Sequence, residues 1–138
     1  MRVAYHLEFC DPASPRLTNF RDDDIIIGTW QKAGTTWVQQ IVAQFIFEGE
    51  TEGLPIGDMS PWLDFRLPPL PEKLPAVEAQ EHRRFLKTHL PLDAMVFEPT
   101  VKYIYIARDG RDCAWSQYNH HFALNDLAYD SLNALPEA

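Results

Sequence analysis

Short apolar runs alternate along the chain with segments whose apolar residues recur at helical spacing. Runs rich in β-branched and aromatic residues predict three short strands, over residues 24–27, 85–88 and 101–107. Apolar residues at helical spacing predict helices over residues 35–47 and 112–124, and one more helix is compatible with residues 76–83.

Strands that alternate with helices predict an α/β fold, in which helices flank a central parallel sheet and ligands bind at the carboxyl ends of the strands. A chain of 138 residues with 46% hydrophobic content is long enough for one domain with a buried core. Residues 1–23 are mixed and polar and are predicted as a lead-in to a domain over residues 24–138. The proline-rich residues 53–75 are predicted as an irregular loop, of the kind that often binds or covers a ligand.

Composition argues against several classes of protein. The formal net charge is −8, whereas general nucleic-acid binding needs a basic surface. No apolar run approaches the ~20 residues of a membrane span, so no membrane association is expected. The two cysteines, Cys10 and Cys113, do not make a disulfide framework and are expected as free thiols in the cytoplasm. No cluster of carboxylates and histidines has metal-ligand spacing, so no metal is expected.

The most informative segment is residues 25–37, which read Ile-Ile-Ile-Gly-Thr-Trp-Gln-Lys-Ala-Gly-Thr-Thr-Trp. A strand that leads through a glycine-containing loop into a helix suits anion binding, because the first N–H groups of the helix have no intrahelical partner. The segment resembles a phosphate-binding P-loop. However, Thr35 occupies the position of the lysine of nucleotide hydrolases, and Lys32 lies before Gly34. A P-loop kinase or nucleotide hydrolase is therefore the weaker alternative.

Two later segments complete a recognisable pattern. Residues 85–91 read Phe-Leu-Lys-Thr-His-Leu-Pro, and residues 103–112 read Tyr-Ile-Tyr-Ile-Ala-Arg-Asp-Gly-Arg-Asp. In this order the three motifs resemble those of the cytosolic-type sulfotransferases, which use 3′-phosphoadenosine 5′-phosphosulfate (PAPS) as donor. The resemblance covers about residues 25–121. It implies a P-loop NTPase-like three-layer fold that is incomplete at the C-terminus.

The resemblance implies a set of loop residues that bind the donor nucleotide: Lys32, Ala33, Gly34, Thr35, Thr36 and Trp37. Lys32 is expected to be the charge partner of the leaving 5′-phosphate, and the two threonines to hold the same phosphate at the helix start. Simple capping of the helix is the alternative for the threonines. Trp37 matches the residue that stacks on adenine, and a place in the core is its alternative.

The later motifs supply a base and two further cationic residues. His89 is the candidate general base, since an imidazole with a pKa of about 6.5 can take a hydroxyl proton near neutrality. Lys87 points to the same face if the strand persists, and is expected to help hold the sulfonate. Arg108 and Ser116 match the family's pair for the 3′-phosphate. The alternative for Arg108 is an ion pair with a neighbouring aspartate, at position 109 or 112.

The function implied is transfer of a sulfuryl group from PAPS to a hydroxyl or amine group of a small-molecule acceptor. Residues of the proline-rich loop suggest an apolar mouth for this acceptor, although ordinary core contacts are an equal alternative: Met59, Trp62, Phe65 and Leu67. A homodimer is a further expectation.

The family also carries a C-terminal Arg-Lys-Gly element that closes over the 3′-phosphate, and this element does not occur before Ala138. The chain is therefore expected to be a fragment or a truncated relative. Residues 1–138 alone are expected to show little or no transfer, and a truncated, non-catalytic sulfotransferase-like domain is the second alternative.

Overall fold

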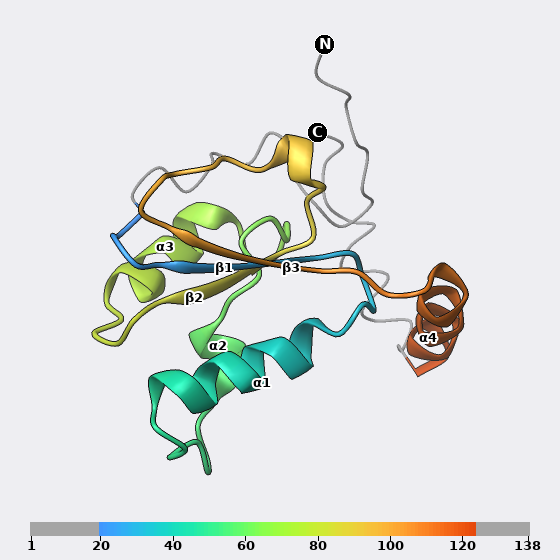
Figure 1. Ribbon diagram of the computed structural model, residues 1–138, viewed down its shortest axis with the longest axis horizontal. Coiled ribbons are helices and arrows are strands. Elements are labelled where there is room, and N and C mark those ends of the chain that lie inside the picture. Colours follow the sequence, from blue (N-terminus) through green and yellow to red (C-terminus); the bar gives the residue numbers. More distant parts are fainter. Residues whose placement is uncertain (1–19, 124–138) are drawn as a thin grey trace.

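The computed structural model describes residues 20–123, in which a three-stranded parallel sheet has helices on both faces (Figure 1). The strands are β1 (Ile25–Thr29), β2 (Phe85–Thr88) and β3 (Lys102–Ile106), in the order β2-β1-β3. All three predicted strands are confirmed, with shifts of one or two residues at their ends. The parallel α/β architecture is confirmed as well.

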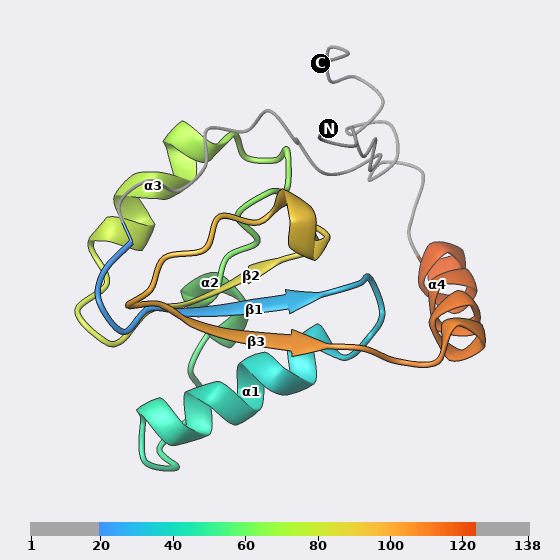
Figure 2. The same cartoon turned by 45° about the horizontal axis from the view of Figure 1, so that its top comes forward.

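Two of the helices follow the strands as predicted. Helix α1 (Thr35–Ile46) follows β1, and helix α4 (Gly110–Ala123) follows β3. In both views α4 lies beyond the carboxyl ends of β1 and β3, at the same end of the sheet as the loop between β1 and α1 (Figure 2). The described part of the chain contains no helix with the length and apolar content that crossing a bilayer requires.

The proline-rich segment was predicted wrongly in part, since only residues 53–55 and 60–69 of it lie outside helices. It contains helix α2 (Ile56–Met59) and the start of helix α3 (Leu70–Glu78), and a short 3₁₀ helix η1 (Leu92–Ala94) follows β2. The helix expected over residues 76–83 therefore begins and ends earlier. Pro69 precedes α3 and Pro71 lies in its first turn, where a missing backbone N–H does no harm. Pro69 and Pro71, two of the prolines that suggested a loop, therefore mark the start of a helix.

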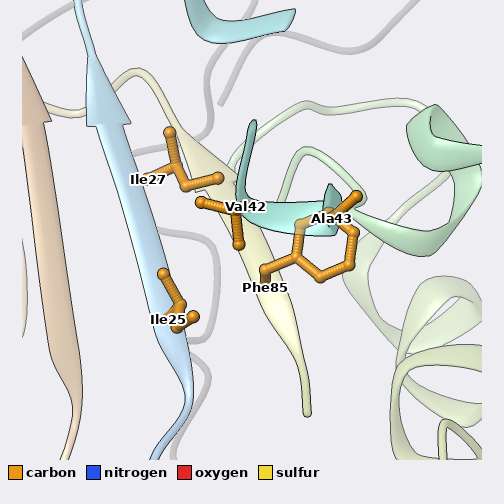
Figure 3. Close-up of a cluster of buried hydrophobic side chains, with 5 residues drawn as sticks. All are labelled: Ile25, Ile27, Val42, Ala43 and Phe85. Atoms are coloured by element: carbon orange, nitrogen blue, oxygen red, sulfur yellow. The ribbon is translucent and has the colours of Figure 1, made fainter. Parts of the chain in front are cut away.

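The isoleucines of β1 alternate between the two faces of the sheet and so build two cores. Ile25 and Ile27 pack with Phe85 against α1, as Figure 3 shows. Ile26 points to the other face, where it packs with Leu86 and with Val77 of α3. Sheet strands buried on both faces read as continuous apolar runs, which explains the Ile-Ile-Ile pattern.

One edge of the sheet is covered by an irregular segment. The amide of Lys87 donates to the carbonyl of Pro61 (3.2 Å), and the amide of Leu63 donates to the carbonyl of Lys87 (3.0 Å). A parallel bridge between Trp62 and Lys87 lies between these bonds. The segment of residues 61–65, here called the 61–65 segment, is therefore attached to the outer edge of β2, close to the end of that strand.

A buried ion pair joins the starts of β1 and β2. Both the Nε and Nη2 groups of Arg84 donate to the carboxylate of Asp24, and both side chains are 1% exposed. Arg21 makes a second link, because its guanidinium donates to the carbonyls of Glu78 and Gln80 at the end of α3. The described end of the predicted lead-in is therefore bonded to the domain, and residues 1–19 lie outside the described part.

Replacing Phe85 with alanine is expected to lower the free energy of unfolding by about 3–5 kcal/mol, because a buried aromatic ring is removed from a packed core. Phe85 is 0% exposed, whereas Phe45 on α1 is 82% exposed and serves as the control. Phe45→Ala should change the free energy by less than about 0.5 kcal/mol. Urea unfolding followed by tryptophan fluorescence measures both values. Equal losses in the two variants would contradict the assignment of the core.

Candidate active site

The loop between β1 and α1 has a geometry that suits an anion. Lys32 (φ 60°) and Gly34 (φ 116°) both adopt left-handed backbone conformations, and the amide of Ala33 donates to the carbonyl of Trp30 (3.2 Å). Gly34 is the N-cap of α1 and makes no side-chain capping bond. The first N–H groups of α1 are thus not capped by the residue before them, and such groups attract negatively charged ligands.

The two threonines of the loop have different surroundings. Thr35 is buried, and its Oγ1 lies 2.5 Å from Oγ1 of Thr29 in a hydroxyl–hydroxyl hydrogen bond. Thr36 is exposed on the first turn of α1. The alternative that a threonine simply caps the helix is wrong, because Gly34 holds the N-cap position.

His89 lies directly after β2 and is held by β1. The two strands pair in parallel with Gly28 opposite Thr88, which brings the next residues, Thr29 and His89, side by side. Nδ1 of His89 lies 2.8 Å from the carbonyl oxygen of Thr29, and a carbonyl can only accept. Nδ1 therefore carries the hydrogen, and in the neutral ring Nε2 keeps its lone pair. The contact selects the tautomer that can act as a base through Nε2.

The charge state of His89 is shifted towards the neutral ring. The residue is 8% exposed, and its burial lowers the pKa of the imidazole below the usual value. The Thr29 carbonyl and the Asp64 carboxylate raise this pKa in part, while the charges of Lys87 and Lys32 lower it. The pKa of His89 therefore favours the neutral ring near pH 7. Of the three residues predicted as catalytic, the structure places His89 and Lys87 against the same Trp62 ring.

Lys87 lies beside the same cluster of rings. Its ammonium is 5.6 Å from the centroid of the Trp62 ring, a cation–π arrangement. Burial lowers the pKa of Lys87, and the charge of Asp64 acts in the opposite direction. The Trp62 ring also packs edge-on against His89, with centroids 4.5 Å apart. Trp62 therefore contacts both candidate site residues of the second motif, Lys87 and His89.

Arg108 reaches back from the end of β3 to the first motif. Its Nη1 donates to the carbonyl of Lys32 (3.1 Å), so the first and third motifs meet at the surface. The alternative ion pair is also present, since Nε of Arg108 lies 3.7 Å from a carboxylate oxygen of Asp112. Both side chains of that pair are well exposed, and such pairs contribute little, about 0.3–0.5 kcal/mol. Among the described residues, Ser116 is half-buried on α4 and is not a hydrogen-bond partner of Arg108.

The structure also places Trp37 and the residues of the expected acceptor mouth. Trp37 is 79% exposed on α1, so the alternative that it belongs to the core is wrong. Among the residues of the expected acceptor mouth, Met59 packs against the core on the α1 face. Trp62 instead stacks on Phe65 (centroids 4.5 Å apart) and contacts His89. Met59 therefore takes the alternative of a core contact, and the acceptor mouth stays a prediction for Trp62, Phe65 and Leu67.

Asp64 and Lys73 were missed in the sequence. Asp64 is 4% exposed, and the amide of His89 donates to both of its carboxylate oxygens at 3.3 Å. The ammonium of Lys73 donates to the carbonyls of Trp62 (2.8 Å) and Phe65 (2.5 Å). The available signal was a pair of charged residues in a long proline-rich segment, and nothing in their spacing shows which contacts they make. Within residues 20–123 no group of three or more His, Cys, Asp or Glu side chains could hold a metal.

Comparison with known proteins gives a consistent assignment. The family model described as "Sulfotransferase domain" matches residues 22–136. The chain is similar to a glycolipid sulfotransferase of Mycobacterium tuberculosis (strain H37Ra), with 39% identity over 99% of this chain and 41% of the relative. It is also similar to sulfotransferase 1A1 of Rattus norvegicus, with 37% identity over 82% of this chain and 41% of the relative. The chain therefore spans about two fifths of the length of these relatives.

Solved structures agree with the sequence comparison. A crystal structure of retinol dehydratase in complex with retinol and PAP superposes with a TM-score of 0.64 and 26% identity, over 78% of this chain and 43% of that one. A second complex of retinol dehydratase, with androsterone and PAP, has the same TM-score over 84% of this chain. With three ordered motifs, a matching fold and relatives of this similarity, the chain belongs to the sulfotransferase domain family.

Proposed function

We propose that this chain carries the donor site and the proton-transfer centre of a PAPS-dependent sulfotransferase. The observation that supports this most strongly is the position of His89 and Lys87 against one Trp62 ring at the carboxyl end of β2, beside β1, whose following loop carries Lys32. The contact of Nδ1 with the Thr29 carbonyl leaves Nε2 of the neutral His89 ring unprotonated. In a parallel α/β sheet this end is where ligands bind.

The reaction that suits this arrangement is a single displacement. His89 Nε2 takes the proton of the acceptor hydroxyl or amine, and the acceptor atom forms a bond to sulfur. The bond between sulfur and the phosphate oxygen breaks, and the electron pair leaves with adenosine 3′,5′-bisphosphate (PAP). Lys32 stabilises the charge on the departing 5′-phosphate, and Lys87 holds the sulfonate as it moves.

The donor nucleotide is proposed to lie over the start of α1. Its 5′-phosphate contacts the loop residues Ala33 and Gly34 and the two threonines that open α1, and the exposed ring of Trp37 stacks on adenine. Arg108 and Ser116 are proposed for the 3′-phosphate. The two solved neighbours are PAP complexes, which supports a nucleotide of this kind as the ligand.

The acceptor is proposed to be an apolar small molecule with a reactive hydroxyl group. The stacked rings of Trp62 and Phe65 lie beside His89 and offer it an apolar surface. The neighbours hold retinol and androsterone, and a relative is named a glycolipid sulfotransferase, which supports the same class of acceptor.

The cytoplasm is the proposed location, and the free thiol of Cys113 supports it. The other cysteine, Cys10, lies outside the described residues. The homodimer stays a prediction.

The test is nucleotide binding by calorimetry, with PAP and AMP as ligands. PAP should bind at least about tenfold more tightly, because a charge-assisted hydrogen bond to the 3′-phosphate is worth about 1.5–3 kcal/mol. Arg108→Ala should remove most of this preference. Arg111→Ala is the matched control, since the side chain of Arg111 is 97% exposed and pairs only loosely with Asp109. Equal affinity for PAP and AMP in the unmodified protein would refute the donor site.

A further inference from the structure

The buried carboxylate of Asp64 lies next to the two candidate site residues of the second motif, Lys87 and His89. Asp64 is 4% exposed, and the only hydrogen bonds found for its side chain among the described residues come from the amide of His89, at a long 3.3 Å to each oxygen. Removing a carboxylate from water is costly unless other charges compensate it. The neighbouring positive charge on Lys87 is the group that provides this compensation. A buried carboxylate beside the proposed base is therefore a candidate for a role in the reaction.

The segment that carries Asp64 is fixed from two sides. Lys73, itself 8% exposed, holds the carbonyls of Trp62 and Phe65 through its ammonium group. The bridge between Trp62 and Lys87 fixes the same segment to β2. A carboxylate on a segment anchored in this way keeps a constant position relative to the residues it faces.

Proton transfer creates a charge that this carboxylate can offset. When His89 takes a proton at Nε2, an imidazolium forms close to two cations, Lys87 and Lys32, whose charges both oppose it. Among the charged groups of residues 20–123 that act on His89, which are these two lysines and Asp64, only Asp64 favours the imidazolium. Without the carboxylate, three positive charges would gather at the end of β2. Interactions that strengthen as charge develops are the ones that speed a reaction.

We propose that Asp64 is a positioning residue of the reaction: it holds the backbone of His89 and offsets the positive charge that forms on the His89 ring beside Lys87. This inference rests on the proposed function, because it assigns a role within the same site. Because Asp64 is buried and bonded to the His89 amide, its proposed effect on the reaction passes through His89 and Lys87.

Asp64→Asn tests the electrostatic part of the role. Asparagine has nearly the same shape and keeps an oxygen for the His89 amide, but it lacks the charge. In NMR titrations of the histidine rings, the His89 midpoint should move to lower pH than in the unmodified protein. Asp58→Asn, an exposed acid on α2, is the matched control and should leave the midpoint in place. An unchanged midpoint in folded Asp64→Asn protein would overturn the proposal.

A second measurement needs no variant. If Asp64 senses His89, the ¹³C resonance of the Asp64 carboxyl carbon should show a step at the pH where His89 titrates. The absence of that step would also overturn the proposal, even if Asp64→Asn failed to fold.

Turnover separates this role from a merely structural one. In Asp64→Asn both limbs of the pH–rate profile should move to lower pH, since the pKa values of His89 and Lys87 both fall when the carboxylate charge is lost. Asp64→Glu, which restores the charge, should move the limbs back. A lower maximum with unmoved limbs would overturn the proposal. The NMR shifts do not require turnover, so shifts without any transfer activity in the full-length protein would refute the proposed function and leave the electrostatic role of Asp64 standing.

Discussion

A His89→Gln variant is expected to transfer sulfate about 10²–10⁴-fold more slowly than the unmodified protein, because the side chain that takes the acceptor proton is lost. Glutamine can occupy a similar space and still donate to the Thr29 carbonyl, but its amide cannot accept a proton near neutral pH. The rate would be measured with labelled PAPS in the full-length protein, since the chain spans about two fifths of its relatives. PAP binding should be unchanged, because His89 has no proposed contact with the nucleotide.

The matched control is His82→Gln. His82 precedes β2 and packs against Phe47, with ring centroids 5.2 Å apart, whereas His89 follows the same strand. The control should keep most of its activity.

In the unmodified protein the rate should fall on acidification only below about pH 6.5, because burial lowers the pKa of His89 and the base stays neutral to a lower pH. If His89→Gln kept full activity, the base assignment would be wrong.

A Lys32→Met variant should lose about 10²–10³-fold in transfer rate, the usual effect of removing one group that stabilises developing charge. Methionine keeps the length and apolar stem of lysine, so the loop retains a side chain of similar size. The loss should appear mainly in kcat, because the charge on the 5′-phosphate grows as the bond to sulfur breaks. Single-turnover measurements with saturating PAPS would isolate this step.

Lys102→Met is the control for the general loss of a positive charge. Lys102 is an exposed residue at the start of β3, the end of the strand remote from the loop. Its replacement should leave kcat within about twofold, since exposed charges beyond about 8 Å are largely screened at physiological salt. Equal losses in both variants would point to net charge and not to a specific contact with the phosphate.

Local patterns were enough to predict the strands and the loop of the first motif. The Ile-Ile-Ile run, the glycines and the Lys-Thr-His sequence act through near neighbours along the chain, so their consequences are visible in the sequence. Helix α3 was misplaced for a local reason too, because proline suits both an irregular loop and the first turn of a helix.

Contacts between distant segments could not be predicted in the same way. The pairs Thr29–His89 and Asp24–Arg84 each join residues 60 positions apart. The contact of Asp64 with His89 depends on how the 61–65 segment attaches to β2. Lys73 of α3 helps to fix that attachment, because its ammonium donates to the carbonyl of Trp62. A single sequence shows that these residues are charged or polar, but the sheet order and the path of the segment select their partners.

The parallel register between β1 and β2 has a further consequence. A slip of β2 by a single residue would turn Lys87 to the opposite face and carry the imidazole away from the carbonyl that orients it. Buried apolar side chains of β2, such as Phe85 and Leu86, fix this register through their packing. They therefore hold the proposed site residues in position as well as stabilising the fold. Substitutions that weaken this packing are expected to lower the proposed transfer activity while the chain still folds.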